Sequence, residues 1–393
     1  MLQICEKNKC TGCMACVDVC PQNCVYVTVD EEGFFRPAID HTKCIDCGVC
    51  AKKCPADNDI RQRNDEAEVE AFSFVHPSKE RLMGSASGGA FVRLAEYIIK
   101  QGGVVFGACY NDDYSVSMKS AFTENELLPM CGSKYVECNV EDSYKQAKKL
   151  LDEGKVVLYT STPCRVAGLY SVLGNKKYDN LYTAELVCHG VPSTKLFNEY
   201  IEYMTDKYGE ITSYSFRDKS KWGWGSWGSF SYKTKRNTEK KKHFVVANDY
   251  YYSLFFKENT LRESCYICKY ASLPRCGDIV LGDFWGIENV DAETAKAIGV
   301  SLIVTTNEKG KTLVGNACGE ELKKTDFAAS IKHNQTVVRP TKRPEGRDCF
   351  YKDFNEKGFL NAAQKYCKLR HIMPVISRYI PRSLKSKVKN LLS

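Results

Sequence analysis

The sequence predicts a small α+β domain, then a larger α/β domain with a mixed sheet, and finally a basic C-terminal tail. Three observations support this fold class. Ten of the 21 cysteines lie within residues 1–64. Residues 65–338 alternate apolar strand-like runs with amphipathic helical runs, which is typical of α/β domains. Residues 339–393 contain 14 Lys or Arg but only 4 Asp or Glu.

Composition favours a globular protein of the reducing cytoplasm. Of the 393 residues, 43% are hydrophobic and 26% are charged, which is enough for more than one domain. Secreted disulfide scaffolds are short, and residues 1–10 lack the apolar run of a signal peptide, so we expect thiolates kept for metal. No stretch approaches the ~18 apolar residues of a membrane span. The net charge of +8 belongs to the tail, which argues against nucleic acid as a partner.

An internal repeat fills the N-terminal block. The spacing Cys-x2-Cys-x2-Cys-x3-Cys-Pro begins at Cys10 and recurs at Cys44. A [4Fe–4S] cubane needs four thiolates, and in two-cluster ferredoxins the cysteine before proline ligates the other cluster. The spacing therefore predicts a ferredoxin-like domain over residues 1–64, in which residues 25–29 and 34–39 form a hairpin. The predicted ligands are Cys10, Cys13, Cys16 and Cys54 for one cluster, and Cys44, Cys47, Cys50 and Cys20 for the other.

Two alternatives concern these cysteines. Zinc sites usually show paired Cys-x2-Cys units rather than triplets followed by Cys-Pro, so zinc is the weaker interpretation. Cys5 and Cys24 lie outside the repeat, and we interpret them as small buried residues.

The middle block holds the elements of the α/β domain. Predicted strands are residues 71–75, 104–109, 156–160, 181–187, 279–282 and 301–306. Predicted helices are residues 89–100, 143–153, 165–173 and 193–207. A polar run at residues 61–66 predicts a linker before this block.

Seven phrases of this block resemble the beta subunit of coenzyme F420-reducing hydrogenase and its wider family. They occur in the family's order over roughly residues 70 to 290, at 84–90 (GSASGGA), 132–136 (GSKYV), 161–165 (STPCR), 187–193 (VCHGVPS), 216–219 (FRDK) before Gly223-Trp224, 264–268 (SCYIC) and 278–286 (DIVLGDFWG). Members of this family with a fused two-cluster ferredoxin domain are familiar. The resemblance implies FAD, an additional [4Fe–4S] cluster and two-electron chemistry at the flavin over residues 65–338.

A small polar segment precedes the predicted helix at 89–100. Its residues Ser85, Ser87, Gly88 and Gly89 would offer backbone N–H groups at a helix N-terminus to the flavin pyrophosphate. The alternative is an ordinary Ser/Gly helix cap, and the resemblance favours the cofactor.

Other flavin-site residues follow from the resemblance. It implies cofactor-binding roles for Ser133, Thr162 and Asp283. Lys134 could stabilise the anionic reduced flavin, or it could be a solvated surface lysine. His189 could donate a proton near the flavin, although a hydrogen-bonded structural histidine is the more common case.

Four scattered cysteines suffice for the additional cluster. Cys164 and Cys188 fall in family phrases after predicted strands, and Cys265 and Cys268 form a Cys-x2-Cys pair. Cys276 is a rival ligand because it follows Cys268 closely. A zinc site or unligated buried thiols are the alternatives.

Two further segments have open interpretations. Residues 222–227 contain three tryptophans, and they predict either an aromatic loop at a substrate pocket or a hairpin tip packed on the core. Residues 372–393 combine apolar positions at helical spacing with Lys/Arg, which suits an anionic membrane surface or an acidic partner. A solvated or core-packed tail is the alternative.

Taken together, the sequence predicts an iron–sulfur flavoprotein oxidoreductase. Electrons would pass between an external carrier such as ferredoxin or a deazaflavin, the [4Fe–4S] clusters and FAD. The flavin would exchange a hydride with an organic substrate, which is coenzyme F420 or another reducible compound. The alternative is an electron-relay subunit that serves a partner enzyme and has no substrate of its own.

Overall fold

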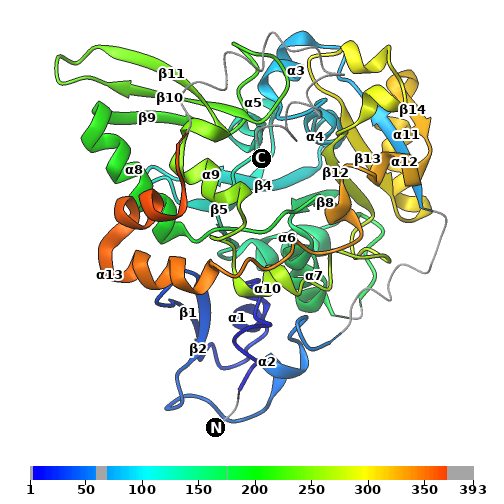
Figure 1. Ribbon diagram of the computed structural model, residues 1–393. Coiled ribbons are helices and arrows are strands. Elements are labelled where there is room, and N and C mark those ends of the chain that lie inside the picture. The colour runs from blue at the N-terminus through cyan, green and yellow to red at the C-terminus, as the bar shows by residue number, and fades with distance from the viewer. Residues whose placement is uncertain (1–2, 59–68, 175, 370–393) are drawn as a thin grey trace.

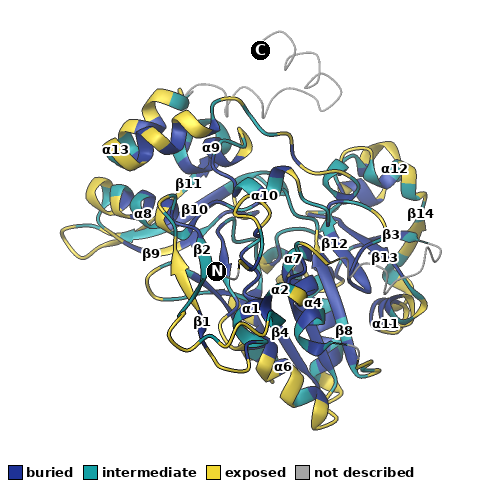
Figure 2. Ribbon diagram, turned by 90° about the horizontal axis from the view of Figure 1, so that it is seen from below, coloured by how far each residue is buried: buried dark blue, intermediate teal, exposed yellow. Residues whose placement is uncertain are grey.

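The computed structural model describes residues 3–58, 69–174 and 176–369 (Figure 1). The N-terminal domain contains two short helices, α1 (Ala15–Asp18) and α2 (Val49–Lys52), and one hairpin. Its strands β1 (Val25–Val29) and β2 (Phe35–Ile39) pair antiparallel, as the sequence predicts. Figure 2 shows this hairpin exposed along β1, in contrast to the buried central strands of the larger domain.

The larger domain is built on a nine-stranded mixed sheet, so the predicted fold class is confirmed. Its strand order is β14-β3-β13-β12-β8-β7-β4-β5-β6. The central strands β12, β8, β7 and β4 run parallel to one another, and β3, β13 and β14 extend the sheet antiparallel. The bounds are β3 Glu70–Phe74, β4 Val104–Tyr110, β5 Val116–Ala121, β6 Cys138–Asn139, β7 Val157–Ser161, β8 Leu181–Leu186, β12 Ile279–Asp283, β13 Ser301–Thr305 and β14 Leu322–Thr325.

Helices cover both faces of this sheet because strand side chains alternate between two apolar cores. On β4, Val105 packs with the helices α4 and α11, whereas Phe106 packs with α6 and α7. Parallel strands buried on both faces form near-continuous apolar runs, which is why the sequence predicts them well. The helices are α3 Lys79–Gly84, α4 Ala90–Lys100, α5 Glu124–Leu127, α6 Ser143–Asp152, α7 Pro163–Leu173, α8 Thr194–Tyr208, α9 Tyr250–Phe256, α10 Glu263–Tyr266, α11 Glu308–Cys318, α12 Phe327–Ile331 and α13 Arg347–Tyr366.

A second, three-stranded sheet was not anticipated from the sequence. It comprises β9 (Glu210–Ser215), β10 (Trp227–Lys233) and β11 (Glu239–Val245) in the order β11-β10-β9. The exposed side chains of β11 are charged, so this strand lacks the apolar alternation that predicts a strand. The tryptophan-rich segment 222–227 connects β9 to β10.

Part of the predicted basic extension belongs to the core. Phe350, Tyr351 and Phe354 of α13 are buried, and the helix packs against α8 and α9. The segment 372–393, for which a membrane or acidic partner is predicted, lies outside the described residues, as does the predicted linker at 61–66. Among the described residues, no helix combines the length and hydropathy needed to cross a membrane.

Candidate functional site

The two cysteine repeats share one local backbone. Gly12 (φ 67°) and Met14 (φ 58°) adopt left-handed conformations in the first repeat. The equivalent Asp46 (φ 53°) and Gly48 (φ 70°) do the same in the second. Such conformations are uncommon outside glycine, so their recurrence at matching positions shows that the spacing imposes the same tight loop twice.

The eight repeat cysteines form two groups. We call Cys10, Cys13, Cys16 and Cys54 the inner set, and Cys20, Cys44, Cys47 and Cys50 the outer set. All four inner thiols are buried. Burial first, and then the neighbouring Cys13, Cys10 and Cys54, raise the pKa of Cys16. Cys50 of the outer set also contributes to this shift, so the assignment of Cys54 to the inner set stays a prediction of the Cys-Pro rule.

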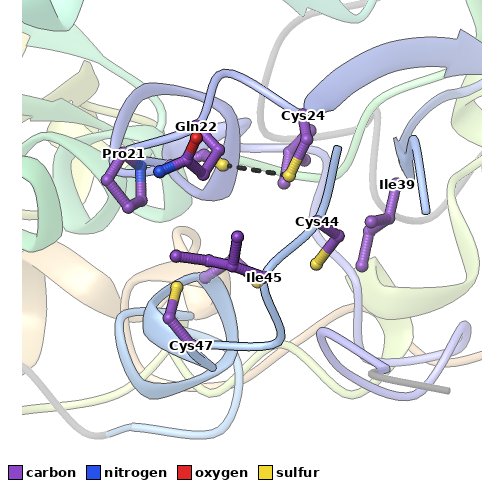
Figure 3. A pocket seen from close by; sticks show the side chains of 10 residues that line it. Pro21, Gln22, Cys24, Ile39, Cys44, Ile45 and Cys47 are labelled. Atoms are coloured by element: carbon purple, nitrogen blue, oxygen red, sulfur yellow. Dashed lines mark hydrogen bonds between the residues drawn. The ribbon is translucent and has the colours of Figure 1, made fainter. Parts of the chain in front are cut away.

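The outer set lines a hollow of its own. Its four cysteines border this hollow together with Cys24 and Ile45 (Figure 3). Cys24 Sγ lies 3.4 Å from Cys20 Sγ. Cys47 is exposed, and Ile45 is 62% exposed. The outer set is therefore the solvent-facing one.

The predicted ligands of the third cluster come together at the carboxyl ends of parallel strands. Cys164, Cys188, Cys265 and Cys268, which we call the edge set, line one hollow. Cys164 follows β7 and Cys188 follows β8, while the other two lie on and after α10. Burial first, and then Cys164 and Cys268, raise the pKa of Cys188 to about 12. Four thiols around one hollow are the donor set that a [4Fe–4S] cluster requires.

The rival ligand Cys276 lies near the edge set but outside its hollow, and Cys164 and Cys268 pack against the same apolar cluster. Its side chain is 2% exposed and packs among Val166, Ala167 and Tyr270. It does not line the hollow of the edge set. Among the described residues, no three His, Cys, Asp or Glu side chains converge closely enough to hold a single metal ion.

The inner set lies against the edge set. Thr11, within the inner repeat, lines the edge hollow beside the four edge cysteines. Tyr144 Oη lies 2.9 Å from the carbonyl of Cys13 and 3.0 Å from that of Arg165. Tyr270 Oη donates to the carbonyl of Pro55 at 2.5 Å. The order in space is thus outer set, inner set, edge set.

His189 lines the edge hollow, as expected for a residue that follows Cys188. Its Nε2 lies 3.1 Å from Glu258 Oε1. Burial lowers the pKa of His189, and the Glu258 charge opposes this effect. Thr162 lines the same hollow and immediately precedes α7, with Oγ1 3.5 Å from Cys164 Sγ.

The segment Ser85–Gly89 packs tightly on the sheet. A Cβ on Gly88 would lie 2.2 Å from the Phe74 carbonyl oxygen and 2.3 Å from the Ser301 nitrogen. Ser301 Oγ lies 2.7 Å from Ser87 Oγ and accepts from the Ala90 N–H at 3.3 Å. Ser85 Oγ donates to the Arg81 carbonyl. Close packing on the sheet thus explains why glycine stands at 88, and the contacts of Ser85 and Ser87 are made by their hydroxyls.

Asp283 lies at the carboxyl end of β12, in a polar cluster that the sequence did not reveal. Arg217 makes a bidentate ion pair with it, at 2.7 and 2.8 Å. Trp224 Nε1 also donates to Asp283, and its ring stacks on Trp285 at 4.8 Å. Lys219 is buried beneath this cluster and donates to the carbonyls of Leu82 and Ser87. Burial first, and then the charge of Arg217, lower the pKa of Lys219 to about 8.

Lys134 and Ser133 lie in the turn before β6. The Lys134 ammonium donates to the carbonyls of Met130, Cys131 and Gly132 at 3.1–3.3 Å. Burial lowers its pKa. The structure therefore places Lys134 as an internal cap of this turn, and neither Lys134 nor Ser133 lines the edge hollow.

Two family profiles match separate segments of the chain. The profile of the C-terminal region of the coenzyme F420 hydrogenase/dehydrogenase beta subunit matches residues 154–328, and that of a 4Fe–4S dicluster domain matches residues 9–58. Over residues 154–328, this chain therefore resembles the coenzyme F420 hydrogenase/dehydrogenase beta subunit family. The predicted resemblance is confirmed, as is a ferredoxin-type domain for [4Fe–4S] clusters.

Curated relatives match parts of this chain. A ferredoxin of Rickettsia felis is 49% identical over 53 residues, which are 14% of this chain and 41% of the relative. NADH-quinone oxidoreductase subunit I 2 of Geobacter metallireducens is 39% identical over 88 residues, 20% of this chain and 63% of the relative. The chain thus spans about half the length of such relatives.

Among solved structures, a chain of the F420-reducing [NiFe] hydrogenase complex from Methanosarcina barkeri is similar. The TM-score is 0.44 at 16% identity, over 77% of this chain and 96% of that one. Likeness at this level assigns no site.

Proposed function

We propose that this chain is an iron–sulfur flavoprotein oxidoreductase of the cytoplasm. It takes up or releases single electrons at its N-terminal domain and serves a two-electron reaction at the sheet edge. The observation that carries the proposal is the spatial order of the three cysteine sets, with Thr11 reaching from the inner repeat into the edge hollow.

Each cysteine set would hold one [4Fe–4S] cluster. Such clusters exchange one electron at a time, whereas FAD exchanges one or two, so the pair joins carriers to hydride chemistry. The exposed Ile45 and Cys47 give an external carrier access to the outer set. The buried inner set is shielded from solvent by the α/β domain.

Flavin would bind at the carboxyl edge beside the edge set. Asp283, Arg217 and Lys219 form a buried polar group with one net positive charge, which suits an anionic cofactor. The Trp224–Trp285 stack offers a flat apolar wall. In this proposal Ser85, Ser87, Gly88 and Gly89 hold the pyrophosphate through backbone groups, with Lys219 fixing their loop from below.

His189 is placed to handle a proton in the edge hollow. Glu258 orients its ring, and Phe255 packs 5.4 Å from it. A histidine held this way could exchange a proton with a substrate that enters the hollow.

Anaerobic purification with iron, acid-labile sulfide and flavin analysis tests the proposal. We expect about twelve irons, four for each set, and one FAD per chain. A preparation with about eight irons and no flavin would contradict both the edge cluster and the flavin site.

A relay subunit without its own substrate is the second candidate. The family's description as a beta subunit favours it, because beta subunits act within assemblies. A purified protein that holds FAD, yet reduces small acceptors only after a partner enzyme is added, would support the relay.

A further inference from the structure

One buried carboxylate joins the N-terminal domain to the α/β domain. Glu137 is fully buried, and its Oε2 accepts the backbone N–H of Phe35 at 3.1 Å. Its Oε1 accepts from Arg262 Nη2 and lies 3.7 Å from Arg165 Nη2. Both arginines are 1% exposed. A buried carboxylate between two guanidinium groups leaves one net positive charge at this boundary.

Arg262 reaches from the α/β domain into the inner repeat. Its Nη1 donates to the Cys10 carbonyl at 3.4 Å, and its Nη2 donates to the Phe35 carbonyl at 3.0 Å. Gly12 makes room for it, since a Cβ there would lie 2.6 Å from Arg262 Nη2. The guanidinium therefore lies beside the loop of the inner set.

Arg165 lies beside the edge set. Its Nη1 is 3.9 Å from Cys164 Sγ, and its Nε donates to the Cys138 carbonyl at 2.9 Å. One carboxylate thus holds two cations, each against a different cysteine set.

We infer that Arg262 and Arg165, held by Glu137, raise the reduction potentials of the groups bound by the inner and edge sets. Reduction adds a negative charge, and a nearby buried cation stabilises that charge strongly because little water screens it. The three residues act through the cysteine sets, so they are positioning residues. This inference rests on the proposed function, since it requires clusters in both sets.

The experiment is an anaerobic redox titration followed by electron paramagnetic resonance. The edge signal is assigned by its loss in a Cys265→Ser/Cys268→Ser protein. In Arg165→Gln, we expect the reduced-to-oxidised ratio of the edge cluster at the wild-type midpoint to fall about tenfold, which is about 59 mV for one electron. Arg262→Gln should shift one of the two N-terminal signals in the same direction.

Two further variants separate charge from folding. Arg165→Lys and Arg262→Lys keep the cation, so they should hold the wild-type potentials. Glu137→Gln removes the negative charge, and both potentials should rise. The opposite sign of this change keeps the inference testable even where a glutamine variant at 165 or 262 fails to load iron.

Arg347→Gln is the matched control. Arg347 is 2% exposed and also joins the two domains, through a bidentate pair with Glu32 at 2.9 and 2.6 Å. It also donates to the Leu261 carbonyl and lies 3.3 Å from a carboxylate oxygen of Glu263, so two carboxylates balance its charge. We expect its potentials to equal those of the wild type.

The outcomes distinguish this inference from the proposed function. Wild-type protein without an edge cluster overturns the proposed function. Full iron content in every variant with unchanged potentials in Arg165→Gln, Arg262→Gln and Glu137→Gln overturns the inference alone. Equal shifts in Arg347→Gln and in the two arginine variants would also overturn it, because domain contact rather than charge would then set the potentials.

Discussion

The N-terminal domain and the sheet edge gather their cysteines in opposite ways. In the N-terminal domain, short spacing alone wraps each repeat into the same left-handed turns. At the edge, Cys164, Cys188 and the pair Cys265/Cys268 meet because β7 and β8 end side by side and α10 lies against them. A local motif tolerates changes elsewhere in the chain, whereas an assembled site depends on long-range packing.

The largest expected effect comes from removing two cysteines of the edge set, which should disrupt only that assembled site. Cys265→Ser/Cys268→Ser should remove about four of about twelve irons and leave both N-terminal clusters, since the repeats do not need the edge. Iron and sulfide analysis checks this outcome. Cys276→Ser is the control and should keep full iron content, because Cys276 lies outside the hollow. Loss of iron in the control instead would reassign the ligands.

A pair of equivalent positions in the two repeats sharpens the comparison. Gly12→Ala places a Cβ against Arg262 and Glu137 in a left-handed conformation, and we expect a loss of about 3 kcal/mol. Asp46→Ala puts alanine into the same backbone conformation at an exposed position and should cost less than about 1 kcal/mol. Urea midpoints for loss of the visible cluster absorbance measure both. Equal costs for the two variants would show that the contact of Gly12 with the α/β domain contributes nothing to stability.

The proposed flavin site at the edge should respond to pH through Lys219. Its ammonium loses its proton above about pH 8, so FAD affinity should fall about tenfold as the pH rises through 8. In the unfolded chain Lys219 stays protonated to about pH 10. The free energy of unfolding therefore rises between about pH 8 and about pH 10, whereas the affinity for FAD falls as the pH rises.

Flavin fluorescence titrations at several pH values measure this dependence. Lys219→Met should bind FAD weakly and without the transition near pH 8. Lys221→Met, at an exposed position of the same loop, should behave as the wild type. A transition that persists in Lys219→Met would exclude Lys219 as its source.

The smallest expected effect concerns the contact between the two regions. Tyr144→Phe removes the hydroxyl that bridges the carbonyls of Cys13 and Arg165, at a cost of about 1 kcal/mol. Tyr159→Phe removes a hydroxyl that contacts Ser143 within the α/β domain. Only the first variant should lower the urea midpoint of the cluster absorbance, whereas both should lower that of tryptophan fluorescence.

The same contrast explains what the sequence could predict. The buried parallel strands and the repeat spacing carry their own signals, so the fold class, the central strands and the ferredoxin-type domain can be predicted from the residues alone. The role of Lys134 as a turn cap could not be predicted from the sequence, because its three partners are backbone carbonyls. Lys219, Arg262 and Glu137 acquire their meaning only from contacts across more than a hundred residues.

Ile45 and Thr11 hold the same place in the two repeats, yet one faces solvent and the other the edge hollow. Oxidative damage follows thiolate exposure, and dissolved oxygen meets Cys47 before any inner or edge cysteine. Air should consequently degrade the protein from the outside inward. If the proposed function holds, a briefly aerated sample would lose electron exchange with external carriers before it loses activity at the sheet edge.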